Sequence, residues 1–271
     1  MRKMGFYLVL TAVFICAFSA KATAVPRSAR VPIIMYHSLA GTEGSTSISG
    51  AEFEADLRYL REHGYQALTL SDLVNFVYHG TPLPEKPIVL TFDDGYYNNY
   101  SIGLPLIRAY DMPIVISVIG VHTEIWSETP ATDLKHGHVT WEQIREMVET
   151  GLVEIANHTW DLHKHENGRK GAAIRPGESM AAYRAVFRED VGKLQKQLAE
   201  RSGVTPISFV YPFGRLCDEA EEILAEMGFL VTVSCRDGVN TLTHGEPDCL
   251  FALRRYERTP ERGIGAILEG L

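Results

Sequence analysis

The sequence is poor in cysteine, and it has neither a long apolar run nor an excess of positive charge. Only four cysteines occur in 271 residues, and no two of them form a Cys-x-x-Cys pair, which excludes a thiolate zinc site of that kind. An exported chain without its leader would keep Cys217, Cys235 and Cys249, and an odd number cannot complete a framework of intrachain disulfides. A bridge between Cys235 and Cys249 and three unpaired thiols both remain open.

The absence of a long apolar run bears on the N-terminus. Arg2 and Lys3 precede an apolar stretch over residues 6–18, and Ala22-Thr23-Ala24 has the small residues of a cleavage site. This stretch is shorter than the roughly 20 residues that a membrane-spanning helix needs. We therefore expect residues 1–24 to be a signal peptide, with the protein secreted or periplasmic and no membrane span after cleavage. An uncleaved anchor is the alternative.

The charge balance is acidic. The formal net charge is −8, and removal of residues 1–24 would take away Arg2, Lys3 and Lys21 but no acid, which changes the charge to −11. Nucleic acids and anionic lipids are poor partners for such a chain, so we expect no nucleic-acid binding.

Apolar runs alternate with amphipathic segments along the whole chain. The pairs Ser49/Glu52 and Thr140/Gln143 have the spacing of capping boxes and each predicts the start of a helix. Strands are expected at 31–36, 66–70, 87–90, 114–119, 152–156, 207–211 and 230–233, helices at 50–63, 71–78, 102–110, 141–149, 180–201 and 218–227, and loops at 121–138 and 164–179. The alternation predicts an α/β fold with a parallel sheet, open or closed into a barrel.

Several polar residues lie at or shortly after the ends of predicted strands: Asp93-Asp94, His37, His158 and Tyr211. A parallel barrel gathers such residues at one rim, where enzymes of this class keep their chemistry. Two adjacent carboxylates can divide the work, one holding a metal and the other acting as general base. An ordinary Asp-Asp-Gly turn is the structural alternative.

His158 and His163 are five residues apart, which on a helix would turn their side chains about 140° from one another. In a loop that leaves a strand they can converge on one ion. Together with Asp94 they would form a set of two histidines and one carboxylate that leaves coordination positions open. His165 is a competing ligand, and either loop histidine could instead be solvated.

Three further positions could serve the same chemistry. His37 could be the general acid, since a histidine titrates near neutral pH, or a strand-end histidine bound to the backbone. Arg255, or Arg254 in its place, could pair with Asp93 and orient it. The backbone N–H of Phe213, after Pro212, could face an oxyanion, although an ordinary proline turn explains the same residues.

The motif Thr91-Phe92-Asp93-Asp94-Gly95, with His158-Thr159 downstream, resembles the polysaccharide deacetylases of carbohydrate esterase family 4, the NodB-homology domain. The five-residue histidine spacing and Met35-Tyr36-His37 near the start are most similar to the exported poly-β-1,6-N-acetylglucosamine deacetylases of biofilm systems, in which the order of the motifs is permuted. The resemblance covers about residues 31–256.

The resemblance implies a distorted (β/α) barrel of about seven parallel strands, with residues 25–271 as one NodB-homology domain. It implies the following roles: Asp93 as the base, His37 as the acid, Arg255 as the arginine beside the base, Asp94, His158 and His163 as ligands of one divalent metal, and Tyr211, Pro212 and Phe213 as the substrate-binding motif. Zinc suits this ligand set, and iron, cobalt or nickel would also fit.

The leading hypothesis from the sequence is a metal-dependent hydrolase. It would remove N-acetyl groups from a surface or cell-wall polysaccharide that contains N-acetylglucosamine, with release of acetate. Two rivals use the same site. One is an esterase acting on an O-acetylated polysaccharide, and the other is a catalytically silent glycan-binding protein.

Overall fold

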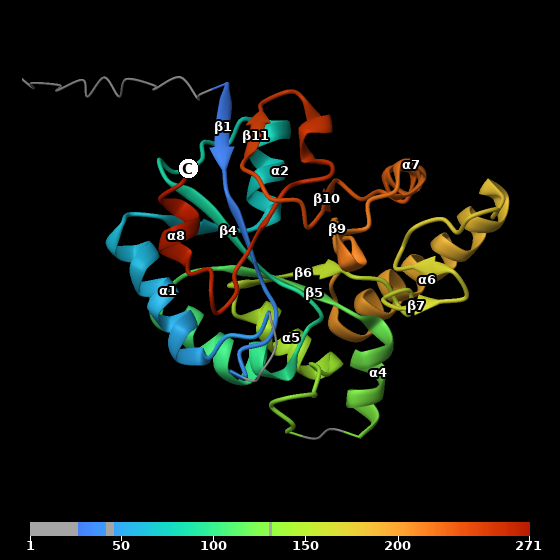
Figure 1. The fold of residues 1–271 in the computed structure, drawn as a ribbon, viewed down its shortest axis with the longest axis horizontal. Helices are drawn as coiled ribbons and strands as arrows, with labels where there is room; N and C mark the ends of the chain where they lie inside the picture. The colour runs from blue at the N-terminus through green and yellow to red at the C-terminus, as the bar shows by residue number, and fades with distance from the viewer. Residues whose placement is uncertain (1–26, 42–45, 130–131) are drawn as a thin grey trace, which may run out of the picture.

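The computed structural model describes residues 27–41, 46–129 and 132–271, and its centre is a curled parallel sheet (Figure 1). Seven strands follow one another in the order β10-β9-β6-β5-β4-β2-β12, and β3 pairs with β4 outside this path. An isolated parallel bridge between Val233 and Leu253 links β10 to the segment just before β12, so the two ends of the sheet approach each other. The strands are β2 (Ile33–Tyr36), β3 (Gln66–Leu68), β4 (Pro87–Phe92), β5 (Ile114–Val118), β6 (Val153–Asn157), β9 (Ser208–Val210), β10 (Val231–Val233) and β12 (Tyr256–Glu257).

This architecture confirms the predicted distorted barrel of about seven parallel strands. Helices connect most successive strands, as right-handed crossovers between parallel strands require. They are α1 (Gly50–Glu62), α2 (Leu70–His79), α3 (Leu104–Tyr110), α4 (Gly120–Glu128), α5 (Trp141–Glu149), α6 (Met180–Ser202), α7 (Asp218–Glu226) and α8 (Ile264–Leu268), with a π-helical turn at Asn99–Gly103 and 3-10 turns at Pro212–Gly214 and Pro247–Leu250.

Both predicted capping boxes are present. The Ser49 hydroxyl accepts the N–H of Glu52, whose carboxylate in turn accepts the N–H of Ser49, and Thr140 and Gln143 do the same at α5. Such reciprocal bonds satisfy two of the N–H groups that a helix start leaves without partners. These helices therefore begin where the sequence predicts.

Alternate residues of the central strands are buried on opposite faces of the sheet. Ile34, Leu90 and Ile116 belong to a core that includes α1, α3 and α5, whereas Val89 and Val115 pack with α2 and other segments on the other side. Because both faces are covered, these strands are continuous apolar runs rather than alternating ones. This burial fixes the strand register, and with it the position of the residues that follow each strand.

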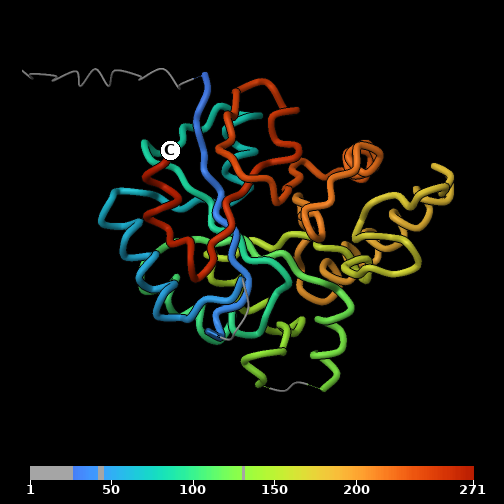
Figure 2. Tube along the Cα trace, in the orientation of Figure 1, coloured from blue at the N-terminus to red at the C-terminus, as the bar shows by residue number. Residues whose placement is uncertain are grey.

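Two expectations about local structure were wrong. The predicted loop 121–138 contains α4, which begins after Ile119 without a side-chain cap and therefore carries no sequence signal for its start. The apolar run 31–36 is not one strand, because Pro32 separates β2 from β1 (Ser28–Val31). β1 instead pairs antiparallel with β11 (Asn240–Thr243), so the blue strand at the start of the described chain and an orange-red strand far along it lie side by side in Figure 2.

Other expectations were left open by the sequence or fall outside the described residues. Cys217, Cys235 and Cys249 are all free, so the alternative of three unpaired thiols holds. The predicted loop 164–179 contains the short hairpin of β7 (His165–Glu166) and β8 (Arg169–Lys170). The proposed signal peptide, residues 1–24, lies outside the described residues, and among the helices that are described none is long and apolar enough to cross a membrane.

Candidate active site

A cavity of about 570 Å³ opens at the carboxyl edge of the sheet. Asp93 and Asp94 directly follow β4, and His158 directly follows β6, so the parallel strands deliver all three to the same edge. Asp94 has a positive φ of 70°, and Gly95 follows with 66°, which turns the chain sharply away from the strand. The residues that line the cavity are Met35, His37, Thr46, Asp93, Asp94, Tyr96, His158, His163, Phe213, Cys235, Asp237, Glu257 and Arg262.

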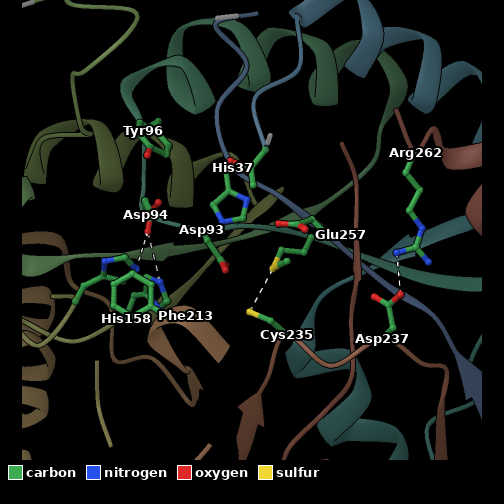
Figure 3. A pocket seen from close by; sticks show the side chains of 13 residues that line it. His37, Asp93, Asp94, Tyr96, His158, Phe213, Cys235, Asp237, Glu257 and Arg262 are labelled. Carbon is green, nitrogen blue, oxygen red and sulfur yellow. Dashed lines mark hydrogen bonds and ion pairs between the residues drawn. The ribbon is translucent and has the colours of Figure 1, made fainter. Parts of the chain in front are cut away.

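Asp94, His158 and His163 form a tight cluster in this cavity (Figure 3). Oδ1 of Asp94 lies 3.5 Å from Nε2 of His158 and 3.3 Å from Nε2 of His163, and the three candidate ligand atoms lie within 4.8 Å of one another. The Nδ1–H of His158 donates to the backbone oxygen of Val210 at 2.7 Å, which leaves Nε2 directed at Asp94. This arrangement fits a divalent cation, since two imidazole nitrogens and a carboxylate oxygen point at one place.

The charges in the cluster depend on one another. Burial disfavours the ionised forms, but a hydrogen bond and the charges of His158 and His163 hold the pKa of Asp94 well below its usual range. Burial likewise opposes a charge on His158, yet Asp94 and Asp93 raise the pKa of His158. Burial and the neighbouring His158 lower the pKa of His163 to about 4, so its ring is neutral at pH 7 and offers a lone pair.

Hydrogen bonds to neighbouring side chains fix the loop between the two histidines. The Thr159 N–H donates to the Asn157 side-chain oxygen at 2.9 Å, and Thr159 itself has a positive φ of 74°. The carboxylate of Asp190, on α6, accepts the N–H of Trp160 at 2.7 Å and that of Asp161 at 2.9 Å. These bonds fold residues 158–163 back on themselves, which allows histidines five apart to meet.

Asp93 is locked in a buried ion pair with Arg255. The guanidinium donates two parallel bonds, Nη1 to Oδ1 at 2.8 Å and Nη2 to Oδ2 at 2.7 Å, and Ser117 adds a third from its hydroxyl at 2.9 Å. Although burial alone would raise it, this guanidinium holds the pKa of Asp93 well below its usual range. Of the two arginines considered from the sequence, the structure pairs Arg255 with Asp93, whereas Arg254 is exposed and donates to the backbone of Asp237.

His37 follows β2 and lines the cavity near Asp93 (Figure 3). Its Nδ1 is buried and has no hydrogen-bond partner in the described part of the chain. Its backbone oxygen accepts a bond of 2.8 Å from the side-chain amide of Asn99, which anchors the strand end. A buried ring nitrogen without a partner is uncommon in native proteins and marks the His37 ring as a group whose hydrogen bonds the described residues do not satisfy.

The predicted substrate-binding motif is only partly in the cavity. The side chain of Tyr211 is fully buried and packs edge-on against Phe209, and Pro212 is also buried, so neither lines the cavity. Phe213 does, with 45% of its surface exposed and its ring centre 4.3 Å from that of His163. Tyr211, which follows β9, is still part of the hydrophobic core. Of the three residues of the motif, the 3-10 turn after it brings only Phe213 to the rim of the cavity. His165, the competing ligand, is exposed and lies against Phe213 instead of joining the cluster.

Sequence reasoning missed two groups of residues. His138 donates from Nδ1 to the backbone oxygen of Asp94 at 2.9 Å, and its ring stacks between Tyr96 and His122 with centres 5.1 and 4.4 Å away. His138 stood in a predicted loop, where nothing tied it to Asp94. The other group includes Asp237 and Glu257, which lie in Figure 3 on the side of His37 opposite to Asp94 and His158. Glu257 lies in β12, a strand of two residues that is too short to predict from a pattern.

Comparison with known proteins identifies the family of this chain. Residues 80–232 match the family described as Polysaccharide deacetylase, a segment that contains Asp93, Asp94, His158 and His163 but neither His37 nor Arg255. The chain is 31% identical over 215 residues to the poly-beta-1,6-N-acetyl-D-glucosamine N-deacetylase of Escherichia coli (strain K12), which covers 71% of this chain and 31% of that protein. The chain therefore spans less than a third of the length of this relative.

A second relative matches over more of its length. It is the putative polysaccharide deacetylase YxkH of Bacillus subtilis (strain 168), 29% identical over 90% of this chain and 78% of that protein. Among solved structures, a de-N-acetylase from Aggregatibacter actinomycetemcomitans has a TM-score of 0.75 at 26% identity, covering 90% of this chain and all of that chain. IcaB from Ammonifex degensii has a TM-score of 0.70 at 28% identity, covering 86% and 93%. The chain belongs to the polysaccharide deacetylase family.

Proposed function

We propose that the protein is a metal-dependent hydrolase that removes N-acetyl groups from a polysaccharide containing N-acetylglucosamine. The observation that carries this proposal is the convergence of three chain segments on one cavity: an Asp-His-His cluster, an ionised Asp93 beside it and the imidazole of His37. Relatives named as N-deacetylases of poly-β-1,6-N-acetylglucosamine support the choice of substrate.

Asp94, His158 and His163 would hold the cation. Zinc is our first choice for this donor set, with Fe²⁺, Co²⁺ and Ni²⁺ as alternatives. When bound, the ion would supply the positive charge that polarises the acetamide carbonyl and lowers the pKa of a water molecule. The hydrogen bond from His158 to Val210 orients the first of these ligands.

Asp93 would be the general base. Its pair with Arg255 holds the pKa of Asp93 well below its usual range, so the carboxylate is ionised at neutral pH and can accept a proton from the attacking water. The same pair makes Asp93 a weak base, which is why an acidified water is needed. Arg255 acts through Asp93, by fixing the direction of both carboxylate oxygens.

His37 would be the general acid that protonates the leaving amine nitrogen. Water adds to the acetamide carbon, the C–N bond breaks, and the products are acetate and a glucosamine unit. Phe213 would form an apolar wall for the sugar beside His163, and its backbone N–H is our candidate donor to the oxyanion.

The place of action belongs to the same proposal. Residues 1–24 would direct export, and residues 25–271 would fold as one deacetylase domain that is periplasmic or secreted. A role in a biofilm polysaccharide would follow from this location, since each amide converted to an amine adds a positive charge to the polymer.

The test is acetate release from oligomers of N-acetylglucosamine, measured with and without a chelator and with metals added back. We expect release that the chelator abolishes and zinc restores. Release from O-acetylated polymers but not from amides would favour an esterase. Glycan binding without turnover by the metal-loaded protein would show a silent binding protein, and either result would refute the proposal.

A further inference from the structure

Glu257 is an ionisable residue of the cavity to which the proposed chemistry gives no role. It lies in β12, next to β2, and lines the cavity together with His37 and Cys235. Figure 3 shows its carboxylate on the side of His37 away from Asp94 and His158. It therefore faces a position next to the reacting group rather than the reacting group itself.

The other carboxylates of the cavity have cationic or imidazole partners. Asp93 is paired with Arg255, Asp94 with two histidines, and Asp237 with Arg262 at 2.8 Å. The side-chain carboxylate of Glu257 forms no ion pair or hydrogen bond within residues 27–41, 46–129 and 132–271, the parts of the chain that are described. Its negative charge is therefore uncompensated in a cavity that also admits substrate.

An uncompensated carboxylate has a specific consequence for a glycan. The hydroxyls of a neutral sugar need acceptors but no net charge, whereas a free carboxylate favours a cation. The cation that the proposed reaction itself creates is the ammonium group of a glucosamine unit. A volume of about 570 Å³ also exceeds what one acetamido group requires, so a neighbouring sugar can enter with it.

We infer that Glu257 recognises the ammonium group of a glucosamine unit next to the N-acetylglucosamine that reacts. The inference rests on the proposed function and predicts, within its substrate class, a preference for glycan chains that are already partly deacetylated. The Asp237–Arg262 pair beside it sets the strength of the effect, because Arg262 neutralises the second carboxylate on that side.

The test compares two ligands of equal length, a glucosamine oligomer and an N-acetylglucosamine oligomer, on the full metal-loaded chain. The glucosamine oligomer carries no acetyl group, so its dissociation constant can be measured by calorimetry without turnover, whereas the N-acetylglucosamine oligomer is compared through its KM for acetate release. Glu257→Gln keeps the shape and hydrogen-bonding ability of the side chain and removes its charge. We expect it to weaken glucosamine binding about five- to ten-fold relative to N-acetylglucosamine, the size of a partly exposed charge interaction.

A second variant should act in the opposite direction. Arg262→Gln frees the Asp237 carboxylate and should strengthen glucosamine binding by a few-fold, with a steeper dependence on salt. Glu261→Gln is the matched control, since Glu261 is an exposed acid nearby that does not line the cavity. For acetate release from oligomers with one free amine, we expect the same order of the proteins: KM should be lowest for Arg262→Gln and highest for Glu257→Gln.

If Glu257→Gln lowers the affinity for both oligomers equally, the inference is overturned and Glu257 binds sugar hydroxyls. If the affinity for neither oligomer changes, the inference is overturned as well. The proposed function fails separately, if no acetate is released. A charge-dependent preference for glucosamine in a protein without turnover would leave the ammonium site standing.

Discussion

Asp190 offers the sharpest test of how the metal-binding loop is built. Its carboxylate accepts two consecutive backbone N–H groups, those of Trp160 and Asp161, between the two candidate histidine ligands. Burial, with a smaller contribution from the charge of Asp161, raises the pKa of Asp190 to about 6 even though the two N–H bonds oppose this shift. The folded protein therefore holds a proton on this group at pH values where the unfolded chain has lost it.

The sign of the effect follows from linkage. Between the usual pKa of an aspartate and about 6, the native state binds more protons than the unfolded state, so this group makes the protein less stable as the pH rises. A shift of roughly two units corresponds to about 2–3 kcal/mol. That contribution is fully present below the unfolded pKa and is lost above about 6.

The perturbation is Asp190→Asn, which cannot ionise. Unfolding by urea at pH 4, 5, 6 and 7, with a chelator present so that metal binding does not contribute, gives the free energy of each protein. We expect the stability of the original protein relative to the variant to fall by about 2–3 kcal/mol from pH 4 to pH 7. Exposed Glu189 provides the control, as Glu189→Gln removes a neighbouring charge that is not buried.

The same variant probes the loop, because an amide offers one acceptor oxygen to two N–H groups. We expect zinc affinity to fall about ten-fold, as for other groups that orient metal ligands. A relative stability that rises with pH would refute the reasoning. It would mean that the two N–H bonds outweigh burial and that the Asp190 carboxylate is ionised throughout.

Three further predictions follow from the site and the core. Arg255→Lys loses the two parallel hydrogen bonds to Asp93, so we expect the rate of acetate release to fall at least about ten-fold. Thermal unfolding should show that the variant is less stable by about 2 kcal/mol, and unchanged activity would contradict the role of the pair. His163→Ala should weaken zinc binding by about 100-fold or more in competition with a chelator, whereas exposed His165→Ala should leave it unchanged, and the reverse order would reassign the ligand. Leu90→Ala, at a fully buried position, should cost about 2–5 kcal/mol in urea unfolding, and a loss below about 1 kcal/mol would show that the sheet is less tightly packed than described.

The order of strands and helices could be predicted because burial on both faces leaves a strong signal. The run around Leu90 is buried on each side, and the capping pairs at Ser49 and Thr140 mark helix starts by local chemistry alone. Where neither signal exists, prediction fails. α4 begins without a side-chain cap, and β12 has two residues and gains its place only by pairing with β2.

The candidate site also contains residues that could be predicted from the sequence and residues that could not. Asp94 and His158 could be found because each follows a buried strand, and the sheet itself brings strand ends together. Tyr211 also follows a strand, but the rule fails there because its ring continues the core, and the chain reaches the cavity two residues later at Phe213. A position after a strand identifies the edge of the sheet, whereas the direction of the side chain is decided by packing.

Two segments that are far apart in the sequence meet at Asp93. His37 follows β2, Arg255 immediately precedes β12, and both lie outside the segment 80–232 that matches the family. The strand order β4-β2-β12 explains their meeting, since β2 lies between the strand that carries Asp93 and the strand after Arg255. Arg255 is fully buried, and without it the Asp93 carboxylate would be left in the interior with its charge unpaired. The base of the proposed reaction therefore depends on the last strand of the sheet as closely as the metal cluster depends on β4 and β6.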